Sequence, residues 1–179
     1  LQQSSAASDV YKRQVSASSA ASLIGIELET ISLALARFQG VKRRMEILAS
    51  CEDYVIYDDF AHHPTEIFKT LSSLREKIGN DQIIAVIEPR SRTMQSGLHD
   101  KEMAKALSPA DSVIWYEGQD VKRSMSAELK KAKAEVYFAA NISEIIQITH
   151  QIKTTKSNIV IMSNGDFSGL RELIKKELD

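Results

Sequence analysis

The sequence predicts an α/β fold, a doubly wound and mostly parallel sheet, preceded by two short helices. Two observations carry this expectation. Beyond Gly40, short apolar runs alternate with amphipathic helical patterns, which is the order of βαβ units. Runs such as IIAVI at 83–87 and IVIM at 159–162 show no polar alternation, as expected of parallel strands that are covered on both faces.

The first part of the chain is expected to lie outside this fold. Residues 1–14, LQQSSAASDVYKRQ, are small and polar and show neither helical nor strand periodicity, so we interpret them as a disordered or non-native segment. Residues 15–39 read as two helices: an alanine-rich stretch stops at Gly25, and apolar residues then recur with a helical period from Leu28 to Phe38. We expect a domain boundary near Gly40 and interpret 15–39 as the end of another domain.

Each element beyond Gly40 has its own signal. Runs rich in Val, Ile and aromatic residues predict strands, and Pro64 suits the first turn of a helix, where its missing N–H costs nothing. The expected strands are 54–57, 82–87, 112–116, 135–138 and 158–162. The expected helices are 64–78, 101–107, 143–152 and 169–178. The charged, alanine-containing segment 122–133 is compatible with either a solvated helix or a loop.

Composition narrows the class of partner. The chain has 23 basic and 24 acidic residues and a formal net charge of -1, so no overall basic field favours nucleic acid or an anionic membrane. No stretch is long and apolar enough to cross a bilayer. The single Cys51 excludes an internal disulfide framework and fits a reducing compartment such as the cytoplasm. Small-molecule partners are therefore expected.

The densest cluster of chemically active groups is Asp58-Asp59-Phe60-Ala61-His62-His63-Pro64-Thr65, between an expected strand and an expected helix. Ligands of open α/β sheets bind beyond the carboxyl ends of the strands, which is where this run should lie. A carboxylate can accept hydrogen bonds from ribose hydroxyls, while imidazole and the free N–H groups of a helix N-terminus face polar parts of a nucleotide. Two other interpretations stay open: Asp and His bind a metal, or Asp59 caps the turn and the histidines satisfy loop carbonyls.

Three further segments are candidate binding loops. Lys42-Arg43-Arg44 lies at the expected domain junction, where an arginine can reach a phosphate held by another domain, although three basic residues are often a solvated surface. Residues 88–94, EPRSRTM, follow an expected strand directly. Their arginines suit binding of a carboxylate, and Glu88 suits binding of an ammonium group. Alternatively, Arg90 and Arg92 form ion pairs on the surface. Residues 163–169, SNGDFSG, suit an anion more weakly. No GxxxxGK[ST] phosphate loop is present.

The segments FQGVKRRME, YDDFAHHPTEI, AVIEPRSRTM and MSNGDFSG together resemble the C-terminal domain of the Mur ligases. The resemblance runs from about Val15 to the end of the chain and implies a Rossmann-like fold for 40–179. EPRSRTM favours the branch that joins UDP-N-acetylmuramate to a cell-wall tripeptide during peptidoglycan recycling. The DDFAHHPT run is also similar to the branch that adds L-alanine. The resemblance makes 15–39 the last helices of a truncated central ATPase domain.

This resemblance implies roles for individual residues. Arg44 is similar to the arginine that approaches the ATP phosphates on domain closure, and therefore serves both catalysis and nucleotide binding. Asp59 is similar to the aspartate that contacts the ribose, and His62 to a histidine near the nucleotide. Glu88, Arg90, Ser91, Arg92 and Thr93 fall in the region that receives the incoming amino acid or peptide, with Arg90 as our choice for its carboxylate. Two residues depart from the family pattern: Asn is expected in place of Arg92, and Gly in place of Asp166.

The implied activity is ATP-dependent amide formation with Mg²⁺, whose ligands are expected mainly in the missing central domain, so the present chain should be inactive alone. Its partners would be small-molecule and peptide substrates and the missing N-terminal and central domains of the same chain. Two alternatives remain open. One is a stand-alone metal-dependent hydrolase with Asp58, Asp59, His62 and His63 as ligands, and the other is a non-catalytic nucleotide- or peptide-binding module.

Overall fold

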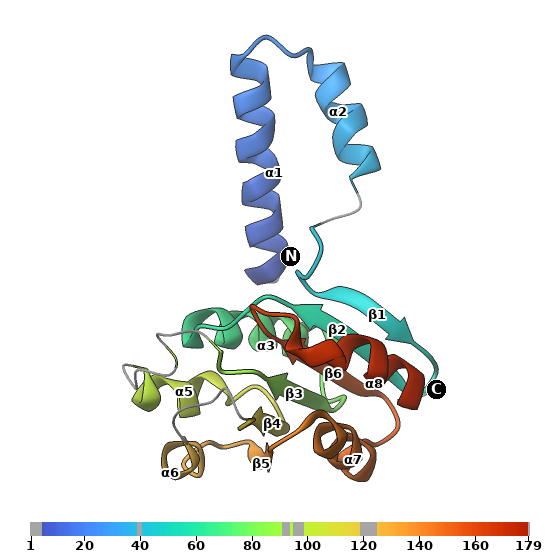
Figure 1. Ribbon diagram of the computed structural model, residues 1–179. Helices are drawn as coiled ribbons and strands as arrows, with labels where there is room; N and C mark the ends of the chain where they lie inside the picture. Colours follow the sequence, from blue (N-terminus) through green and yellow to red (C-terminus); the bar gives the residue numbers. More distant parts are fainter. Residues whose placement is uncertain (1–4, 39–40, 91–93, 95–98, 119–124, 179) are drawn as a thin grey trace. The chain divides into compact units, whose positions relative to one another are not determined.

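The computed structural model describes residues 5–38, 41–90, 94, 99–118 and 125–178. These residues belong to two compact units, Leu1–Lys42 and Arg43–Asp179. The ribbon in Figure 1 shows the elements of each unit, which we describe separately. Gln39 and Gly40, where the sequence places a boundary, lie outside the described residues.

The first unit consists of two helices that contact each other, α1 (Ser5–Leu23) and α2 (Leu28–Arg37). Gly25 between them has a φ of +86°, a left-handed conformation that suits glycine at the end of a helix. The expectation that the helical pattern starts at Val15 is wrong, because α1 begins at Ser5. The stretch set apart as aperiodic contains Ala, Lys, Arg and Gln, which favour a helix through intrinsic propensity without any amphipathic pattern.

The second unit contains a six-stranded sheet in the order β1-β2-β6-β3-β4-β5. Its strands are β1 (Glu46–Ser50), β2 (Tyr54–Asp59), β3 (Ile83–Ile87), β4 (Ser112–Tyr116), β5 (Glu135–Ala139) and β6 (Ser157–Met162). All neighbours pair in parallel except β1, which lies antiparallel to β2 at the edge. The predicted α/β fold with a mostly parallel sheet is therefore confirmed.

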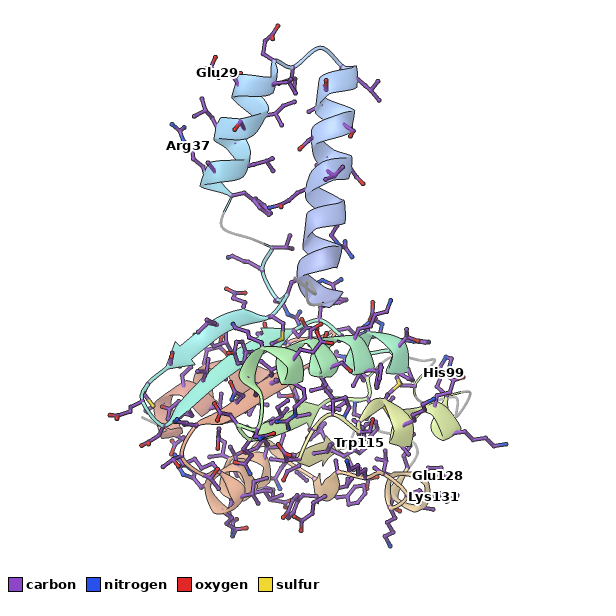
Figure 2. All side chains as sticks on the ribbon, turned by 180° about the vertical axis from the view of Figure 1, so that it is seen from behind. Glu29, Arg37, His99, Trp115, Glu128 and Lys131 are labelled. Atoms are coloured by element: carbon purple, nitrogen blue, oxygen red, sulfur yellow. The ribbon has the colours of Figure 1, made fainter. Side chains whose placement is uncertain are left out.

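Helices cover both faces of this sheet (Figure 1). They are α3 (Pro64–Ile78), α5 (Asp100–Ala106), α6 (Ser126–Leu129), α7 (Ile142–Ile152) and α8 (Leu170–Leu178), the last preceded by a 3₁₀ turn at Phe167–Gly169. One core cluster joins α3, α5 and α6 to one face of the sheet, and a second joins α7 and α8 to the other. Trp115 is fully buried in the first cluster (Figure 2). Alternate residues of β2, β3, β4 and β6 therefore pack into different cores.

Three details differ from the sequence prediction. Strand β1 was not expected, because EILAS is short and only partly buried, and a register shift between Ile47 and Ala49 interrupts its pairing. Strand β2 continues through Asp58 and Asp59, so both carboxylates lie in the sheet rather than in the loop after it. The ambiguous segment 122–133 contains the short helix α6. Among the described residues, no helix has the length and apolarity needed to cross a membrane.

Candidate functional site

The candidate site lies where β2, β6 and β3 end side by side. Strand β6 is the last strand of the chain, yet it pairs between β2 and β3. Its following residues, Ser163 to Asp166, therefore lie between the end of β2 and Glu88, the first residue after β3. The backbone confirms this proximity, since Ser163 N–H donates to the Asp59 carbonyl and Glu88 N–H to the Met162 carbonyl. Such a crevice beyond parallel strand ends is the usual ligand position in this class of fold.

Asp58 and Asp59 face opposite sides of the sheet, because successive side chains of a strand alternate. Asp58 Oδ2 lies 2.9 Å from Arg171 Nε on α8, and 3.3 Å from Arg43 Nε. Asp59 Oδ1 instead accepts a hydrogen bond from Thr70 Oγ1 on α3 at 3.4 Å. The two carboxylates that are adjacent in sequence therefore belong to different interactions, one mainly structural and one at the candidate nucleotide site.

Asp59 is only 3% exposed, and both of its carboxylate oxygens already accept hydrogen bonds from the protein. Oδ1 accepts from Ala61 N–H at 2.8 Å, and Oδ2 from Met45 N–H at 2.9 Å. Burial raises the pKa of Asp59, and these two N–H groups, the charge of Arg44 and the Thr70 hydroxyl oppose that rise. The structure thus shows Asp59 holding two backbone segments together, one of which carries Arg44.

Arg44 lies on a strained turn that Asp59 helps to hold. Its neighbours Arg43 and Met45 have φ values of 59° and 52°, in the left-handed region that ordinary side chains avoid. Besides the Asp59 contact to Met45, Arg43 N–H donates to Glu46 Oε2 at 2.9 Å. Arg44 itself is exposed, with its guanidinium carbon 5.8 Å from the centroid of the Phe60 ring. The turn therefore presents a cation to solvent at the carboxyl edge of the sheet, and persistent strain of this kind is common at binding sites.

His62 and His63 follow on the segment that leads into α3. His62 Nδ1 lies 3.1 Å from the Phe60 carbonyl oxygen, which can only accept, so this nitrogen donates and Nε2 is left as an acceptor in the neutral ring. His62 Nδ1 also lies 3.7 Å from Glu66 Oε2. His63 is the N-cap of α3, and its Nδ1 accepts weakly from Thr65 N–H at 3.4 Å. The histidines thus have different roles: His62 offers an acceptor near Asp59, and His63 caps the helix.

Arg43 connects the turn to the loop after β6. Its Nη2 donates to the carbonyl oxygens of Ser163 and Gly165, the latter at 2.9 Å. Its guanidinium carbon lies 5.1 Å from the centroid of the Phe60 ring. The residue pattern of the basic run did not distinguish Arg43 from Arg44, and only the family resemblance singled out Arg44; in the structure Arg43 binds the protein while Arg44 is exposed. Arg43 thus joins residues that are far apart in the sequence into one surface.

The loop after β6 also contacts the loop after β3. Ser163 Oγ donates a hydrogen bond to Glu88 Oε2, and Glu88 is only 7% exposed. Gly165 N–H donates to Ser163 Oγ at 2.9 Å, so this N–H group serves the loop itself. A Cβ atom placed on Gly165 would lie 2.5 Å from Arg90 Nη1, which shows that the Arg90 side chain crosses this glycine closely. SNGDFSG, the weakest candidate in sequence, is therefore central to the site.

The predicted site residues fall into three groups. Arg44, Asp59 and His62 come together at the end of β2, and Glu88 and Arg90 lie beside the β6 loop. Ser91, Arg92 and Thr93 lie outside the described residues. The sequence analysis named Arg43 and Ser163 only within candidate binding loops, and it named neither Arg171 nor His99. Only the fold reveals these roles, because their partners are distant in the sequence.

A metal centre is not supported by this geometry. Among the described residues, no group of three or more His, Cys, Asp or Glu side chains is placed to hold a metal ion. The proposed ligand set of Asp58, Asp59, His62 and His63 fails for a specific reason: Asp58 faces α8 with Arg171, on the opposite side of the sheet from Asp59. The metal-dependent hydrolase alternative is therefore wrong for these four residues.

Comparison with known proteins agrees with the fold. A family model described as "Mur ligase, glutamate ligase domain" matches residues 43–165, which include the candidate site except for Asp166 and Arg171. The chain belongs to the Mur ligase family. Its match to this Mur ligase domain begins at Arg43, the first residue of the second compact unit.

Individual Mur ligases show how much of a longer protein the chain resembles. It is 34% identical over 155 residues to the UDP-N-acetylmuramate–L-alanyl-γ-D-glutamyl-meso-2,6-diaminoheptandioate ligase of Haemophilus influenzae, covering 86% of the chain and 34% of that protein. It is 45% identical over 150 residues to a UDP-N-acetylmuramate–L-alanine ligase of Streptococcus agalactiae, covering 80% of the chain and 33% of the relative. The crystal structure of a murein peptide ligase from Psychrobacter arcticus matches with a TM-score of 0.73 and 34% identity, over 90% of this chain and 35% of that one. The chain thus spans about a third of the length of these relatives.

Proposed function

We propose that this chain acts as the C-terminal domain of a longer ligase that joins UDP-N-acetylmuramate to L-alanyl-γ-D-glutamyl-meso-diaminopimelate in peptidoglycan recycling, with ATP and Mg²⁺. The single observation that carries the proposal is the exposed Arg44, presented on a strained turn that the buried Asp59 holds from β2. The name of the H. influenzae relative supplies the substrates of the proposal. A ligase of this kind would act in the cytoplasm, and magnesium would be held mainly by the central domain.

Arg44, Asp59 and His62 form the proposed nucleotide contact. An exposed guanidinium suits the charged oxygens of a phosphate, and the His62 Nε2 acceptor suits an amino or hydroxyl group of the nucleoside. Asp59 accepts from two backbone N–H groups and from the Thr70 hydroxyl, and a carboxylate has room for about four donors, so one ribose hydroxyl can still donate to it. Its larger contribution in our proposal is indirect, since it fixes the turn that presents Arg44.

The loop after β3 is the proposed contact for the peptide. Arg90 can bind a peptide carboxylate with two parallel hydrogen bonds, and its backbone follows a fully buried strand, which limits its motion. Ser91, Arg92 and Thr93 remain candidates for the same substrate. Glu88 was expected to meet the incoming ammonium group, but one of its oxygens already accepts from Ser163 Oγ. We therefore propose that Glu88 mainly orients the β6 loop beside Arg90.

The proposed reaction uses these contacts in two steps. The muramate carboxylate attacks the terminal phosphate of ATP and forms an acyl phosphate with release of ADP. The peptide amine then attacks the acyl carbon, and phosphate leaves from the tetrahedral intermediate as the amide forms. Closure of this domain over the nucleotide would align the amine and exclude water from the anhydride. Residues 15–39 would be the last helices of the central ATPase domain in this arrangement.

The test compares the chain with the longer ligase that contains it. We expect no phosphate release when the chain alone is incubated with ATP, Mg²⁺, UDP-N-acetylmuramate and the tripeptide. The longer protein should release phosphate only when both substrates are present, and should form the amide. Release by the isolated chain would contradict the proposed division of labour, and a longer protein without this activity would contradict the proposed reaction.

A second candidate is the UDP-N-acetylmuramate–L-alanine ligase, favoured by the 45% identity to the S. agalactiae relative. The same assay separates the two by replacing the tripeptide with L-alanine. The tripeptide should be the better substrate by kcat/KM if the first proposal is correct. A preference for L-alanine would transfer the assignment to the second.

A further inference from the structure

His63 and His99 meet across two helices that both begin at this edge of the second unit. Their Nε2 atoms lie 3.1 Å apart, and their ring centroids 4.3 Å apart at an interplanar angle of 70°. His63 is the N-cap of α3 and His99 the N-cap of α5, which pack against each other. The His99 side chain is only 18% exposed, and Figure 2 shows it beside the start of α5. The pair therefore joins the first residues of two packed helices.

The surrounding contacts fix the direction of the hydrogen bond. His63 Nδ1 accepts from Thr65 N–H, so the neutral ring carries its proton on Nε2. That Nε2–H then faces His99 Nε2, which must accept. His99 consequently carries its proton on Nδ1, and Nδ1 lies 3.1 Å from Glu102 Oε2, a carboxylate that accepts it. All three contacts agree with one arrangement of protons.

Metal binding is the competing explanation of two facing imidazoles. A metal held by both Nε2 atoms would require both to be unprotonated, and the His63 proton would then sit on Nδ1, where it would oppose the Thr65 N–H group. No third ligand joins the pair in the part of the chain that the structure describes. The contacts thus favour the hydrogen bond.

We propose that Glu102 and His99 are positioning residues that lock His63 in its Nε2–H tautomer and thereby hold the start of α3. His63, the N-cap of α3, follows His62 directly, and Thr70 of the same helix contacts Asp59. The series Glu102–His99–His63 therefore supports the segment that carries the candidate nucleotide contacts. The effect of this series on nucleotide binding rests on the proposed function. The assignment of the two tautomers is independent of it.

Protonation is expected to break this series. A proton added to His99 enters its Nε2, so both facing Nε2 atoms then carry N–H groups and neither can accept. A proton added to His63 enters Nδ1 instead, where it opposes the Thr65 N–H group. The charged or titratable groups near the pair are Glu102 on α5 and, beside His63, His62 with Glu66 on α3. The connection between the starts of α3 and α5 should therefore be lost when His99 is protonated.

The decisive experiment is a ¹⁵N NMR measurement of the histidine side chains of this chain at neutral pH. His63 should show a protonated Nε2 and His99 a protonated Nδ1. His99→Leu should shift His63 away from a single tautomer, whereas His99→Gln, whose Oε1 can accept, should retain it. The exposed His150, on α7, offers the matched control His150→Leu. A protonated Nε2 on His99, or stoichiometric Zn²⁺ binding that shifts both Nε2 resonances, would overturn the proposal.

The functional consequence is measured in the longer ligase. His99→Leu should raise the KM for ATP about tenfold, the factor associated with one hydrogen bond of ordinary strength, with little change in kcat. His99→Gln should recover most of the loss, and His150→Leu should have none. An unchanged KM for ATP in His99→Leu would overturn the positioning role. A longer protein without ligase activity would instead contradict the proposed function and leave the tautomer result standing.

Discussion

Arg171 on α8 places its Nε atom 2.9 Å from Oδ2 of Asp58 on β2, and the Asp58 side chain is only 2% exposed. Arg43 Nε lies 3.3 Å from the same oxygen, so two cations from distant parts of the sequence share one buried carboxylate. Arg171 Nη1 also donates to the Asp166 carbonyl at 2.6 Å. The last helix is thereby connected both to β2 and to the loop at the candidate site.

Removing Arg171 should destabilise the second unit. A buried carboxylate that loses a cationic partner keeps its desolvation cost without compensation. Removing one partner of a buried ion pair therefore typically destabilises a protein by about 3–5 kcal/mol. Because Arg43 remains near Asp58, we expect Arg171→Leu to lower the free energy of unfolding by about 3 kcal/mol, at the low end of that range. Urea denaturation measures it, with Lys176→Leu on the exposed face of α8 as the control. Equal losses in the two variants would show that Asp58 does not depend on Arg171.

Asp59 should make the stability of the unit depend on pH. Burial raises its pKa above the unfolded value of 3.8, so the native state binds the proton more tightly than the unfolded state. The carboxyl group therefore contributes more to stability at low pH, and loses part of this contribution as pH rises through the native pKa. The stability of the wild type relative to Asp59→Asn should accordingly fall as pH rises from about 4, and then level off. Urea midpoints of both proteins between pH 4 and 7 test this, and a difference that grows with pH would contradict it.

The sheet was predictable because its signal is local. Residues 83–87 and 113–116 are continuous apolar runs, and their burial on both faces follows directly from that composition. Strand β1 lacks this signal, since only one of its faces packs on the core and its sequence alternates irregularly. Its place is set by pairing with β2 rather than by its own residues.

The site was predictable in its location but not in its contacts. The run at 58–65 indicated the end of β2, and the fold confirms that position. Which of Arg43 and Arg44 is exposed depends on the backbone of the turn and on carbonyl groups after β6. Likewise, His99 meets His63 only because α3 and α5 pack together. Contacts between residues distant in sequence leave no periodic pattern to detect.

Arg44→Ala in the longer ligase should lower kcat more strongly than it lowers the affinity for the substrates. An arginine that reaches the phosphates on closure stabilises charge that develops in the transition state, and loss of one such donor costs about 3 kcal/mol, or about a hundredfold in kcat. Lys42→Ala, in the same basic run, provides the control. Steady-state kinetics with saturating UDP-N-acetylmuramate and tripeptide measure the effect. Similar kcat values for the two variants would show that Arg44 is only a surface cation.

Arg90→Lys should raise the KM for the tripeptide and leave that for ATP nearly unchanged. Lysine keeps the charge but loses the planar two-point contact to a carboxylate. Arg92→Lys is the matched comparison, since Arg92 is the departure from the family pattern and the other candidate for the same role. Both variants are assayed in the longer ligase with the tripeptide and with L-alanine. A normal tripeptide KM in Arg90→Lys, with the defect confined to Arg92→Lys, would reassign the carboxylate contact to Arg92.

Gly165→Ala tests the position of Arg90 without changing any charge. The added Cβ would lie 2.5 Å from Arg90 Nη1 and 2.9 Å from Arg90 Cδ, so the arginine side chain must move. Because that side chain is long and flexible, the free energy of unfolding should change by less than about 1 kcal/mol. The KM for the tripeptide should nevertheless rise as in Arg90→Lys.

A double-mutant cycle completes this test, because two changes that act on one contact do not add. Gly165→Ala should raise the tripeptide KM in the wild type and have little further effect in the Arg90→Lys background. Independent, multiplicative effects of the two substitutions would show that Gly165 acts on the site by a route other than Arg90. The close approach of Arg90 to the β6 loop would then be a structural contact without a part in peptide binding.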